Sequence, residues 1–167
     1  MGSDAQYELI QGELVSVSPS SANSNVVLSK VHGFLFIFVS AHELGTLSVG
    51  EGGYLLESNP DTVVAPDVGF ILRDRMPQPV PKRGYFTVRP DLAVEVISPT
   101  DERGDMQRKQ AVYDRIGVPI VWWIDPIRET ATIHSFGQPI RYLERTGLLD
   151  GGDILPGFTL ALADIFD

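Results

Sequence analysis

A glutamate interrupts an apolar segment that is typical of a buried strand. Glu95 lies in the run LAVEVI at 92–97, whose length and composition predict a strand buried on both faces of a sheet. An ionised carboxylate in such a strand is costly unless it pairs with a cation or binds a metal. The alternative is an edge strand on which Glu95 faces solvent or pairs with an arginine.

A lysine falls on the apolar face of a predicted helix. At about 100° per residue, Met106, Tyr113 and Ile116 define one face of a helix over 101–116, and Lys109 lies in the middle of that face. Such a lysine either extends its ammonium to the edge of the face or reaches a buried anion. Because the strand with the glutamate leads directly into this helix, a contact between the two side chains would satisfy both charges.

Two further carboxylates are candidates of a weaker kind. Asp67 follows Pro66 in a strand predicted over 63–72, where a turn aspartate is the simpler interpretation. Glu13 begins a strand after the tight turn at 11–12, where a surface glutamate is the simpler interpretation. Weaker still are Glu8, Asp91 and Asp125.

Carboxylates and a lysine gathered in one place would suit metal-assisted hydrolysis of a phosphodiester. Hard oxygen ligands favour Mg²⁺ or Mn²⁺. A metal held by Asp67 and Glu95 would bind a phosphate oxygen and lower the pKa of a bound water. Lys109 would orient that water or stabilise negative charge in the transition state.

The elements that must position these residues form a strand–helix–strand unit. Strand 91–98, helix 101–116 and strand 119–124 follow one another closely, and such a crossover produces a parallel pair of strands. Around it the sequence predicts a helix over 25–44, a long proline-containing loop over 73–90, and hairpins over 7–17 and 130–144. The expected fold is α/β, with a mixed β-sheet, two main helices and additional antiparallel hairpins.

Length and composition describe an ordinary globular chain. The 167 residues fit one domain over 1–167, and the absence of cysteine excludes disulfides, thiolate metal sites and a cysteine nucleophile. No uninterrupted apolar run approaches the ~18 residues of a membrane span. The N-terminus lacks the pattern of a signal peptide. We therefore expect a soluble, cytoplasmic protein with no membrane partner.

The charge is unevenly distributed. The net charge of −9 disfavours a broad, non-specific nucleic-acid surface. Residues 73–115, however, carry nine Lys/Arg and seven Asp/Glu, so that this segment is slightly basic within an acidic chain. Either a mixed, solvated surface or a local site for an anionic ligand accounts for this pattern.

Several short motifs occur in a specific order along nearly the whole chain. They are GELV at 12–15, PDVGF at 66–70, PDLAVEVISP at 90–99, the spacing Lys109…Tyr113…Gly117-Val118, WIDP at 123–126 and LPGF at 155–158. This set resembles the Uma-two family of restriction-endonuclease-like proteins, a bacterial group in the PD-(D/E)XK nuclease superfamily. The resemblance implies a restriction-endonuclease-like fold and a DNA endonuclease that uses Mg²⁺ (or Mn²⁺).

The resemblance also implies roles for particular residues. Asp67 and Glu95 match the motif carboxylates that bind the metal, and the carbonyl of Val96 is a further ligand by analogy. Ile97 stands where the superfamily usually has a lysine. In this family the lysine comes from the following helix instead, which matches Lys109.

The N-terminal part of the motif set is less complete. Glu13 matches the family's N-terminal acidic position and would complete the site. The family often has a histidine near the first helix, where this sequence has Asn-Ser-Asn at 23–25. That departure bears on whether the site is active.

Two functions remain open on the sequence alone. The first is a metal-dependent DNA endonuclease, for which a homodimer would place two active sites on two strands; the hairpin 130–144 and exposed aromatic residues would offer an interface. The second is a catalytically inactive binding or assembly module that retains the nuclease fold, which the acidic charge and the missing histidine favour. The joint presence of Asp67, Glu95 and Lys109 argues against the second. No phosphate-binding loop or nucleophile elbow is present.

Overall fold

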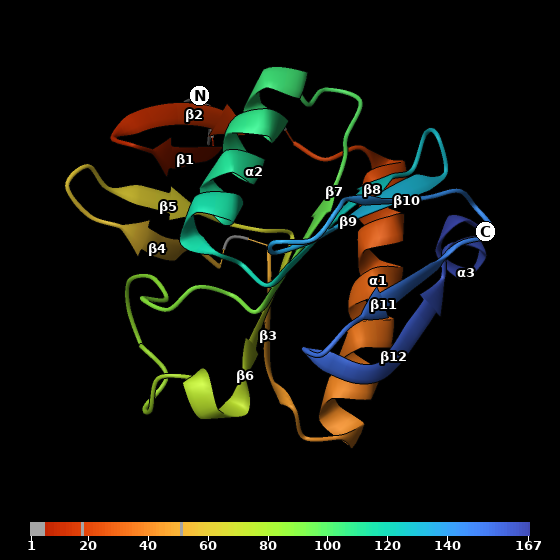
Figure 1. Ribbon diagram of the computed structural model, residues 1–167. Coiled ribbons are helices and arrows are strands. Elements are labelled where there is room, and N and C mark those ends of the chain that lie inside the picture. Colours follow the sequence, from red (N-terminus) through yellow and green to blue (C-terminus); the bar gives the residue numbers. More distant parts are fainter. Residues whose placement is uncertain (1–5, 18, 51) are drawn as a thin grey trace.

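A six-stranded mixed sheet forms the centre of the protein (Figure 1). The computed structural model describes residues 6–17, 19–50 and 52–167. The strand order is β10-β9-β8-β7-β6-β3, with parallel pairing between β7 and β8 and antiparallel pairing between the other neighbours. The strands are β3 (Gly45–Val49), β6 (Val68–Leu72), β7 (Leu92–Val96), β8 (Ile120–Asp125), β9 (Thr130–Ser135) and β10 (Arg141–Leu143).

The predicted strand–helix–strand unit is confirmed. Strand β7 is followed by helix α2 (Arg103–Ile116), which returns the chain to β8 beside β7. Helix α2 ends at Gly117, whose φ of 72° is the left-handed conformation that glycine adopts without a steric penalty. Every residue of β7 and of β8 is buried, as the apolar runs predicted.

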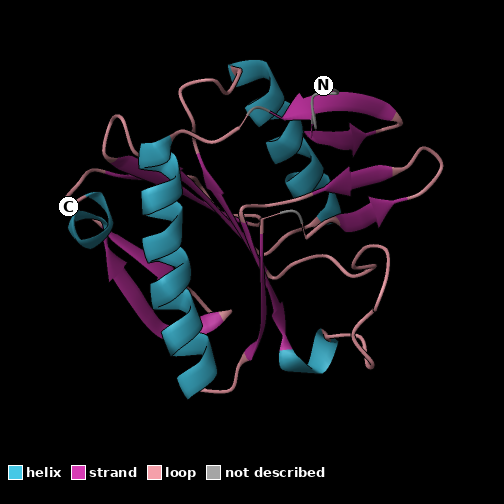
Figure 2. Cartoon of the chain, turned by 180° about the vertical axis from the view of Figure 1, so that it is seen from behind, coloured by secondary structure: helices cyan, strands magenta, loops and turns pink. Residues whose placement is uncertain are grey.

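The two main helices lie on opposite sides of the sheet (Figure 2). Helix α1 (Ala22–Ala41) buries a row of residues spaced four apart, Val27, Val31, Leu35 and Val39, against one face. Strand β7 alternates between the two sides: Leu92, Val94 and Val96 pack with α1, and Ala93 packs with α2. By the same alternation Glu95 faces α2.

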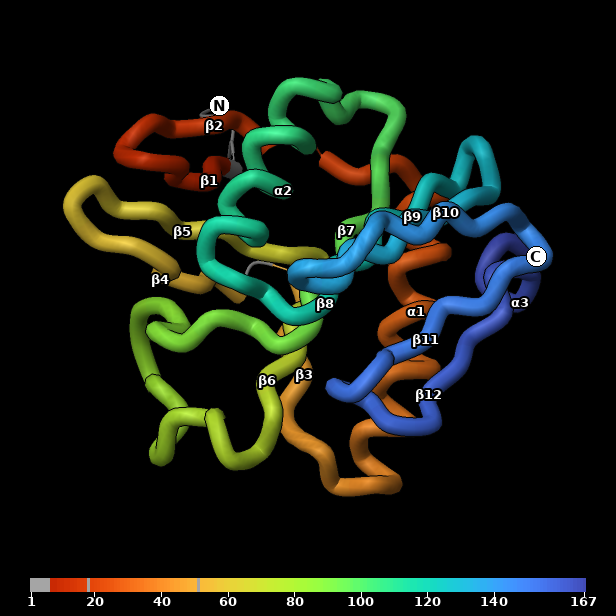
Figure 3. The backbone as a smooth tube through the Cα atoms, viewed as in Figure 1, coloured from red at the N-terminus to blue at the C-terminus, as the bar shows by residue number. Residues whose placement is uncertain are grey.

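A second sheet lies on the side of α2. Its order is β2-β1-β5-β4, and all its pairings are antiparallel. The smooth backbone trace shows the β1–β2 hairpin running beside α2 (Figure 3). The strands are β1 (Gln6–Ile10), β2 (Glu13–Val17), β4 (Tyr54–Glu57) and β5 (Thr62–Val64).

A third, two-stranded sheet lies on the side of α1. Strand β11 (Leu148–Gly151) pairs with β12 (Leu155–Ala161), which leads into the short helix α3 (Leu162–Phe166). Phe158 of β12 packs edge-on against Phe38 of α1, with 5.1 Å between ring centroids. This pair of strands covers part of α1, and the sequence did not predict it as a separate sheet.

The predicted strand 63–72 is wrong in one respect. The chain breaks at 65–67, so that β5 belongs to the second sheet and β6 to the central one. Pro66 lacks a backbone N–H and cannot continue a sheet ladder through this point. The predicted loop 73–90 holds one turn of 3₁₀ helix, η1 (Arg73–Arg75), and the hairpin predicted over 130–144 is present as β9–β10.

Helix α1 is more apolar than the uninterrupted runs in the sequence indicated. By length and composition alone it is long and apolar enough to cross a membrane, which the search for an unbroken apolar run had not detected. Polar residues such as Ser29 and Lys30 interrupt the run without changing the average. Core helices of soluble proteins and signal sequences pass the same test, and in α1 28% of the tested window is buried in the structure.

Candidate active site

Glu95 is a buried carboxylate in the middle of the central sheet. Its strand lies between β8 and β6, so the edge-strand alternative is wrong. Its two oxygens lie 2.9 and 3.0 Å from Nζ of Lys109, and the hydroxyl of Tyr113 donates to Oε1 over 2.5 Å. Both donors come from α2, one turn apart, because residues spaced by four share a face of the helix.

Lys109 reaches a cluster of oxygen acceptors rather than solvent. Besides Glu95, its Nζ lies 2.8 Å from Oε1 of Glu8 and donates to the carbonyl of Ala65 over 3.3 Å. The sequence left open whether the ammonium extends to the edge of the helix face or reaches a buried anion. The structure shows that it reaches buried anions. The three N–H groups of the ammonium all face protein acceptors.

Glu8, which the sequence analysis ranked among the weakest candidates, contacts Lys109 directly. It is buried, and its Oε1 also accepts from the backbone N–H of Ala65 over 2.8 Å. Residues two apart in a strand face the same side, and Glu8 faces the interior with the buried Ile10. No local pattern marked this side as the inner one, because Tyr7 and Leu9 make the other face of the strand apolar as well.

Glu13 does not join this cluster. It pairs directly with Ile10 across the hairpin and thus faces the same side as Glu8, but at the turn end of the hairpin. It is exposed and opens onto a neighbouring hollow that Arg108 and Arg115 line. The expectation that Glu13 completes the site is therefore corrected: the structure brings Glu8 to Lys109 instead.

Asp67 lies beside the end of β7. Its Oδ2 accepts from the backbone N–H of Val96 over 2.7 Å, and its side chain is half-buried. It comes from the connection between β5 and β6, the place where the chain changes sheets. Asp67, Glu95 and the backbone of Val96 are thus neighbours, as the two carboxylate motifs predicted.

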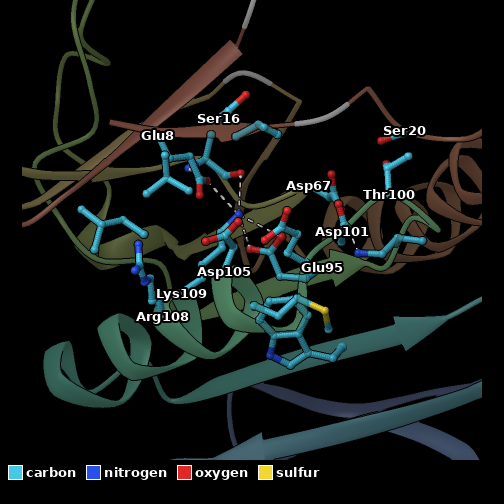
Figure 4. A pocket seen from close by; sticks show the side chains of 18 of the residues that line it. Glu8, Ser16, Ser20, Asp67, Glu95, Thr100, Asp101, Asp105, Arg108 and Lys109 are labelled. Atoms are coloured by element: carbon cyan, nitrogen blue, oxygen red, sulfur yellow. Dashed lines mark hydrogen bonds and ion pairs between the residues drawn. The ribbon is translucent and has the colours of Figure 1, made fainter. Parts of the chain in front are cut away.

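These residues line one cavity of about 480 Å³ between the β1–β2 hairpin, α2 and the end of β7 (Figure 4). Glu8, Asp67, Glu95 and Lys109 converge in this close view, with dashed contacts meeting at the ammonium. Further charged residues of the lining come from the segment before α2 and from its first turns: Asp101, Glu102, Asp105 and Arg108. The volume is in the range of small-ligand sites.

Residues 23–25, where the family often has a histidine, do not line the cavity. Ser24 is buried and donates through its hydroxyl to the carbonyl of Ile97 over 2.9 Å. Ser21 donates through its backbone N–H to the hydroxyl of Ser98. These two contacts fasten the beginning of α1 to the end of β7, so this segment supports the site from outside.

Burial is the largest influence on the ionisation of the cluster, and the charges of its neighbours modify that influence. Burial raises the pKa of Glu95 to about 8, and Asp67 and Glu8 add to this effect, while the Lys109 ammonium and the Tyr113 hydroxyl oppose it. Burial also raises the pKa of Asp67. Burial alone would lower the pKa of Lys109, but the carboxylates of Glu95 and Glu8 together raise it above its ordinary value. Three carboxylates thus share one ammonium.

A metal fits this site in part. Among residues 6–17, 19–50 and 52–167, no three acidic, histidine or cysteine side chains are grouped closely enough to form a ready-made metal-binding set. Asp67 and Glu95 are nonetheless adjacent hard-oxygen donors in a cavity with surplus negative charge. Those are the donors and the charge that a small divalent cation prefers.

The fold and this arrangement of an aspartate, a glutamate and a helical lysine define a restriction-endonuclease-like protein. A family profile described as "Uma2: Putative restriction endonuclease" matches residues 1–163, and the chain belongs to this family. The resemblance to the Uma-two family seen in the sequence is thereby confirmed.

A solved structure shares the fold. It is a crystal structure described as "a putative nuclease belonging to DUF820 from Anabaena variabilis ATCC 29413". The two align with a TM-score of 0.84 and 18% sequence identity, over 96% of this chain and 89% of the other. The predicted α/β fold, with a mixed sheet, two main helices and antiparallel hairpins, is confirmed. None of the curated proteins matches the chain.

Proposed function

We propose that this protein is a metal-dependent endonuclease that hydrolyses phosphodiester bonds in DNA. The observation that carries the proposal is the convergence of Asp67, Glu95 and Lys109 in one cavity, from the connection before β6, from β7 and from α2. A lysine buried among carboxylates has no need of such a cavity if its role is only to stabilise the core. Carboxylates that can hold a divalent metal, together with one ammonium, suit a reaction on a phosphate group.

In this proposal Asp67 and Glu95 hold Mg²⁺ (or Mn²⁺), with the carbonyl of Val96 as a further ligand. The bound metal supplies a Lewis acid for a phosphate oxygen and lowers the pKa of a coordinated water. The surplus negative charge of the cluster favours binding of a divalent cation, because three carboxylates face a single ammonium.

The chain's own residues orient the attacking water, stabilise charge on the phosphate and hold one another in place. Lys109 presents an ammonium that can orient the attacking water or stabilise charge on the phosphate as the bond breaks. Glu8 keeps the proton on that ammonium and fixes its direction, since its Oε1 is also held by the N–H of Ala65. Tyr113 holds one oxygen of Glu95 in place.

The proposed substrate is DNA, approached through a local contact rather than a broad basic surface. The net charge of −9 disfavours a large non-specific surface, whereas Arg108 at the cavity offers a local phosphate contact. A homodimer would bring two such sites to the two strands of a duplex.

The decisive experiment compares cleavage by matched variants. Supercoiled and linear DNA are incubated with Mg²⁺ or Mn²⁺ and with the wild type, Glu95→Gln, Asp67→Asn or Glu13→Gln. We expect metal-dependent cutting that Glu95→Gln and Asp67→Asn reduce by at least ~10²-fold and Glu13→Gln leaves within about threefold. Equal activity in wild type and Glu95→Gln contradicts the proposed site. Cleavage confined to a parallel RNA substrate contradicts the assignment to DNA.

A second candidate function is a catalytically inactive module that keeps the nuclease fold. One observation favours it: both oxygens of Glu95 are already engaged by Lys109 and Tyr113. Calorimetric titration with Mn²⁺ separates the two candidates, since a metal must displace or share these contacts. Wild-type binding that is lost in Asp67→Asn supports the enzyme. Absence of binding together with absence of cleavage supports the module.

A further inference from the structure

Within the slightly basic segment 73–115, the excess of positive charge lies in residues 73–90, which we call the basic loop. The basic loop carries five Lys/Arg and one aspartate, and the rest of the chain carries eight Lys/Arg and 21 Asp/Glu. Its charge is therefore +4, against −13 for the remainder. Figure 3 shows it as the long connection between β6 and β7. This separation of charge favours a site for an anionic partner over a mixed, solvated surface.

Asp91 closes the base of the basic loop. Its buried carboxylate contacts the guanidinium groups of Arg75 and Arg89, which lie near the two ends of the loop. Arg75 also donates to the carbonyl of Arg89 over 3.3 Å, and Asp91 accepts from the backbone N–H of Leu72 over 2.9 Å. A long loop whose ends are tied together in this way is a defined structural unit, and such loops often carry function.

The basic loop is anchored to the protein at two further points, and its tip is free. Met76 is buried in a small apolar cluster. Phe86 donates through its N–H to the carbonyl of Gly53 over 3.0 Å and accepts from the N–H of Leu55 over 2.8 Å. Between these anchors every residue from 78 to 85 is exposed, and two of them are proline. Because proline restricts the backbone, this tip has fewer conformations to lose when it binds a partner.

The tip carries the cations of the loop that are available to a partner. The other three Lys/Arg pair with Glu43 or with Asp91. Lys82 and Arg83 are exposed and form no ion pair within residues 6–17, 19–50 and 52–167. Tyr85, which follows closely, is 52% exposed. Ammonium, guanidinium and tyrosine hydroxyl groups are the donors with which proteins contact phosphate oxygens.

The basic loop lies near the candidate active site. Phe86 forms a bridge to Tyr54 of β4, and Tyr54 pairs with Val64 of β5. The next residue is Ala65, whose carbonyl accepts from Lys109. Because neighbouring strands lie about 4.8 Å apart, the backbone of Phe86 is about 10 Å from that of β5. One strand of DNA advances about 3.4 Å per nucleotide, so the tip lies where phosphates several nucleotides from Lys109 would pass.

We propose that residues 78–85 bind the phosphate backbone of DNA that enters the candidate active site. The choice of DNA rests on the proposed function, and the surface is defined by Lys82, Arg83 and Tyr85. Contacts with phosphates carry no sequence information, so the tip adds affinity and orients the duplex without selecting a sequence. At 0.1 M salt, charges more than about 10 Å apart are largely screened, so the acidic remainder of the chain opposes this local contact only weakly.

A narrow partner suits this tip better than a flat one. Lys82 and Arg83 are adjacent on a projection, and one strand of a duplex can contact them without touching the rest of the chain. An anionic bilayer or the broad face of an acidic protein would also bring its charge close to the remainder, whose net charge is −13. The position and the small size of the cationic surface therefore favour a nucleic-acid backbone.

The test measures DNA binding without cleavage, by fluorescence anisotropy in the absence of divalent metal. A labelled duplex is titrated with the wild type, with Lys82→Gln/Arg83→Gln and with the control Lys30→Gln/Arg141→Gln. Lys30 lies on α1, on the other side of the central sheet, and Arg141 lies on β10 at its far edge. Both double variants remove two positive charges, so the change in net charge is the same.

The loop variant should weaken binding far more than the control. At about 50 mM salt we expect its dissociation constant to rise about tenfold or more, and the slope of log K against log salt to fall in magnitude by about 1.8, which is ~0.9 for each lost phosphate contact. The control should change the dissociation constant by less than about threefold. Circular dichroism checks that both variants fold, which is expected because Lys82 and Arg83 are exposed.

Three results would overturn the proposal. One is a wild type that binds no duplex up to about 100 μM at low salt, the weak end of non-specific binding. Another is an equal loss of affinity in the loop variant and the control, since net charge would then explain it. The third is binding to vesicles of phosphatidylcholine and phosphatidylglycerol that depends on Lys82 and Arg83 while DNA binding does not. A wild type that binds DNA through the tip but never cuts it would contradict the proposed function and support this surface, so the two failures are distinguishable.

Discussion

The ammonium of Lys109 on α2 and the carboxylate of Glu8 on β1 lie 2.8 Å apart. The contact joins the helix that follows the central strand β7 to a hairpin of the second sheet. Because Glu8 also accepts from the N–H of Ala65, it fixes the chain two residues before Asp67. The N-terminal hairpin is therefore part of the site and not an appendage to it.

Replacing Glu8 should destabilise the protein although it lies near the N-terminus. Glu8→Ala leaves the N–H of Ala65 without its acceptor and removes one partner of Lys109, so we expect a loss of about 1–3 kcal/mol in the free energy of unfolding. Urea denaturation at pH 7 measures it. Glu13→Ala serves as the control and should stay within about 0.5 kcal/mol. Equal losses in the two variants would show that the contact with Lys109 is not what matters.

Removing the ammonium should have an effect that depends on pH. Lys109→Met leaves Glu8 and Glu95 buried without their counter-charge, which costs about 3–5 kcal/mol when the carboxylates are ionised. At pH 5 the cost should be smaller, because Glu95, with its pKa near 8, is then protonated in the folded protein. Denaturation of Lys109→Met and of the exposed neighbour variant Arg108→Met at pH 5 and pH 9 tests this. A cost that does not change with pH in Lys109→Met would refute it.

Without added metal, Glu95 should make the protein less stable as the pH rises. Its pKa is about 8 in the folded protein against an ordinary value of 4.5, so the folded state binds more protons than the unfolded state between these values. The contribution is fully present below about pH 4.5 and is lost as the pH passes about 8, with an overall change of a few kcal/mol. Subtracting the profile of Glu95→Gln isolates it. A difference profile that rises with pH would have the wrong sign.

Tyr113 should tune the ionisation of Glu95. Its hydroxyl donates to Oε1 and thereby opposes the rise in the pKa of Glu95, so Tyr113→Phe should raise that pKa further. The lost hydrogen bond should also cost about 0.5–1.5 kcal/mol. Titration of the carboxyl ¹³C resonance of Glu95 measures the shift, and Tyr142→Phe, on an exposed tyrosine, is the control. A pKa that falls in Tyr113→Phe would contradict the direction of this contact.

Much of the site was predictable because its signals are local. The run of apolar residues around Glu95 identified a buried strand, and the spacing of Met106, Tyr113 and Ile116 identified the helix face that carries Lys109. A short crossover between strand and helix then places the two side chains on the same side of the sheet. These features made a contact between Lys109 and Glu95 plausible, and the structure decided in its favour against an edge strand for Glu95 and a solvent-directed Lys109.

Other parts depended on contacts between segments far apart in the sequence. The strand predicted over 63–72 has no local mark that assigns its two halves to different sheets, apart from Pro66. The exposure of Phe34 and Ile37 on α1 depends on where β11 and β12 lie, and the sequence did not predict that sheet. Sheet membership is decided by which partners each strand finds, and no pattern within the strand records them.

The amino-acid sequence by itself determined the strand–helix–strand unit, the apolar strand that contains Glu95 and the helix face on which Lys109 lies, because periodicity and run length act over a few residues. Only the tertiary structure decided that this strand is central, so that Glu95 is buried. Only the tertiary structure decided which N-terminal glutamate meets Lys109. Glu8 and Glu13 face the same side of the hairpin, and the packing of Ile10 against the α2 side sets how far along the helix that hairpin sits. A difference of a few residues along one face is settled by packing between elements, which a local pattern does not contain.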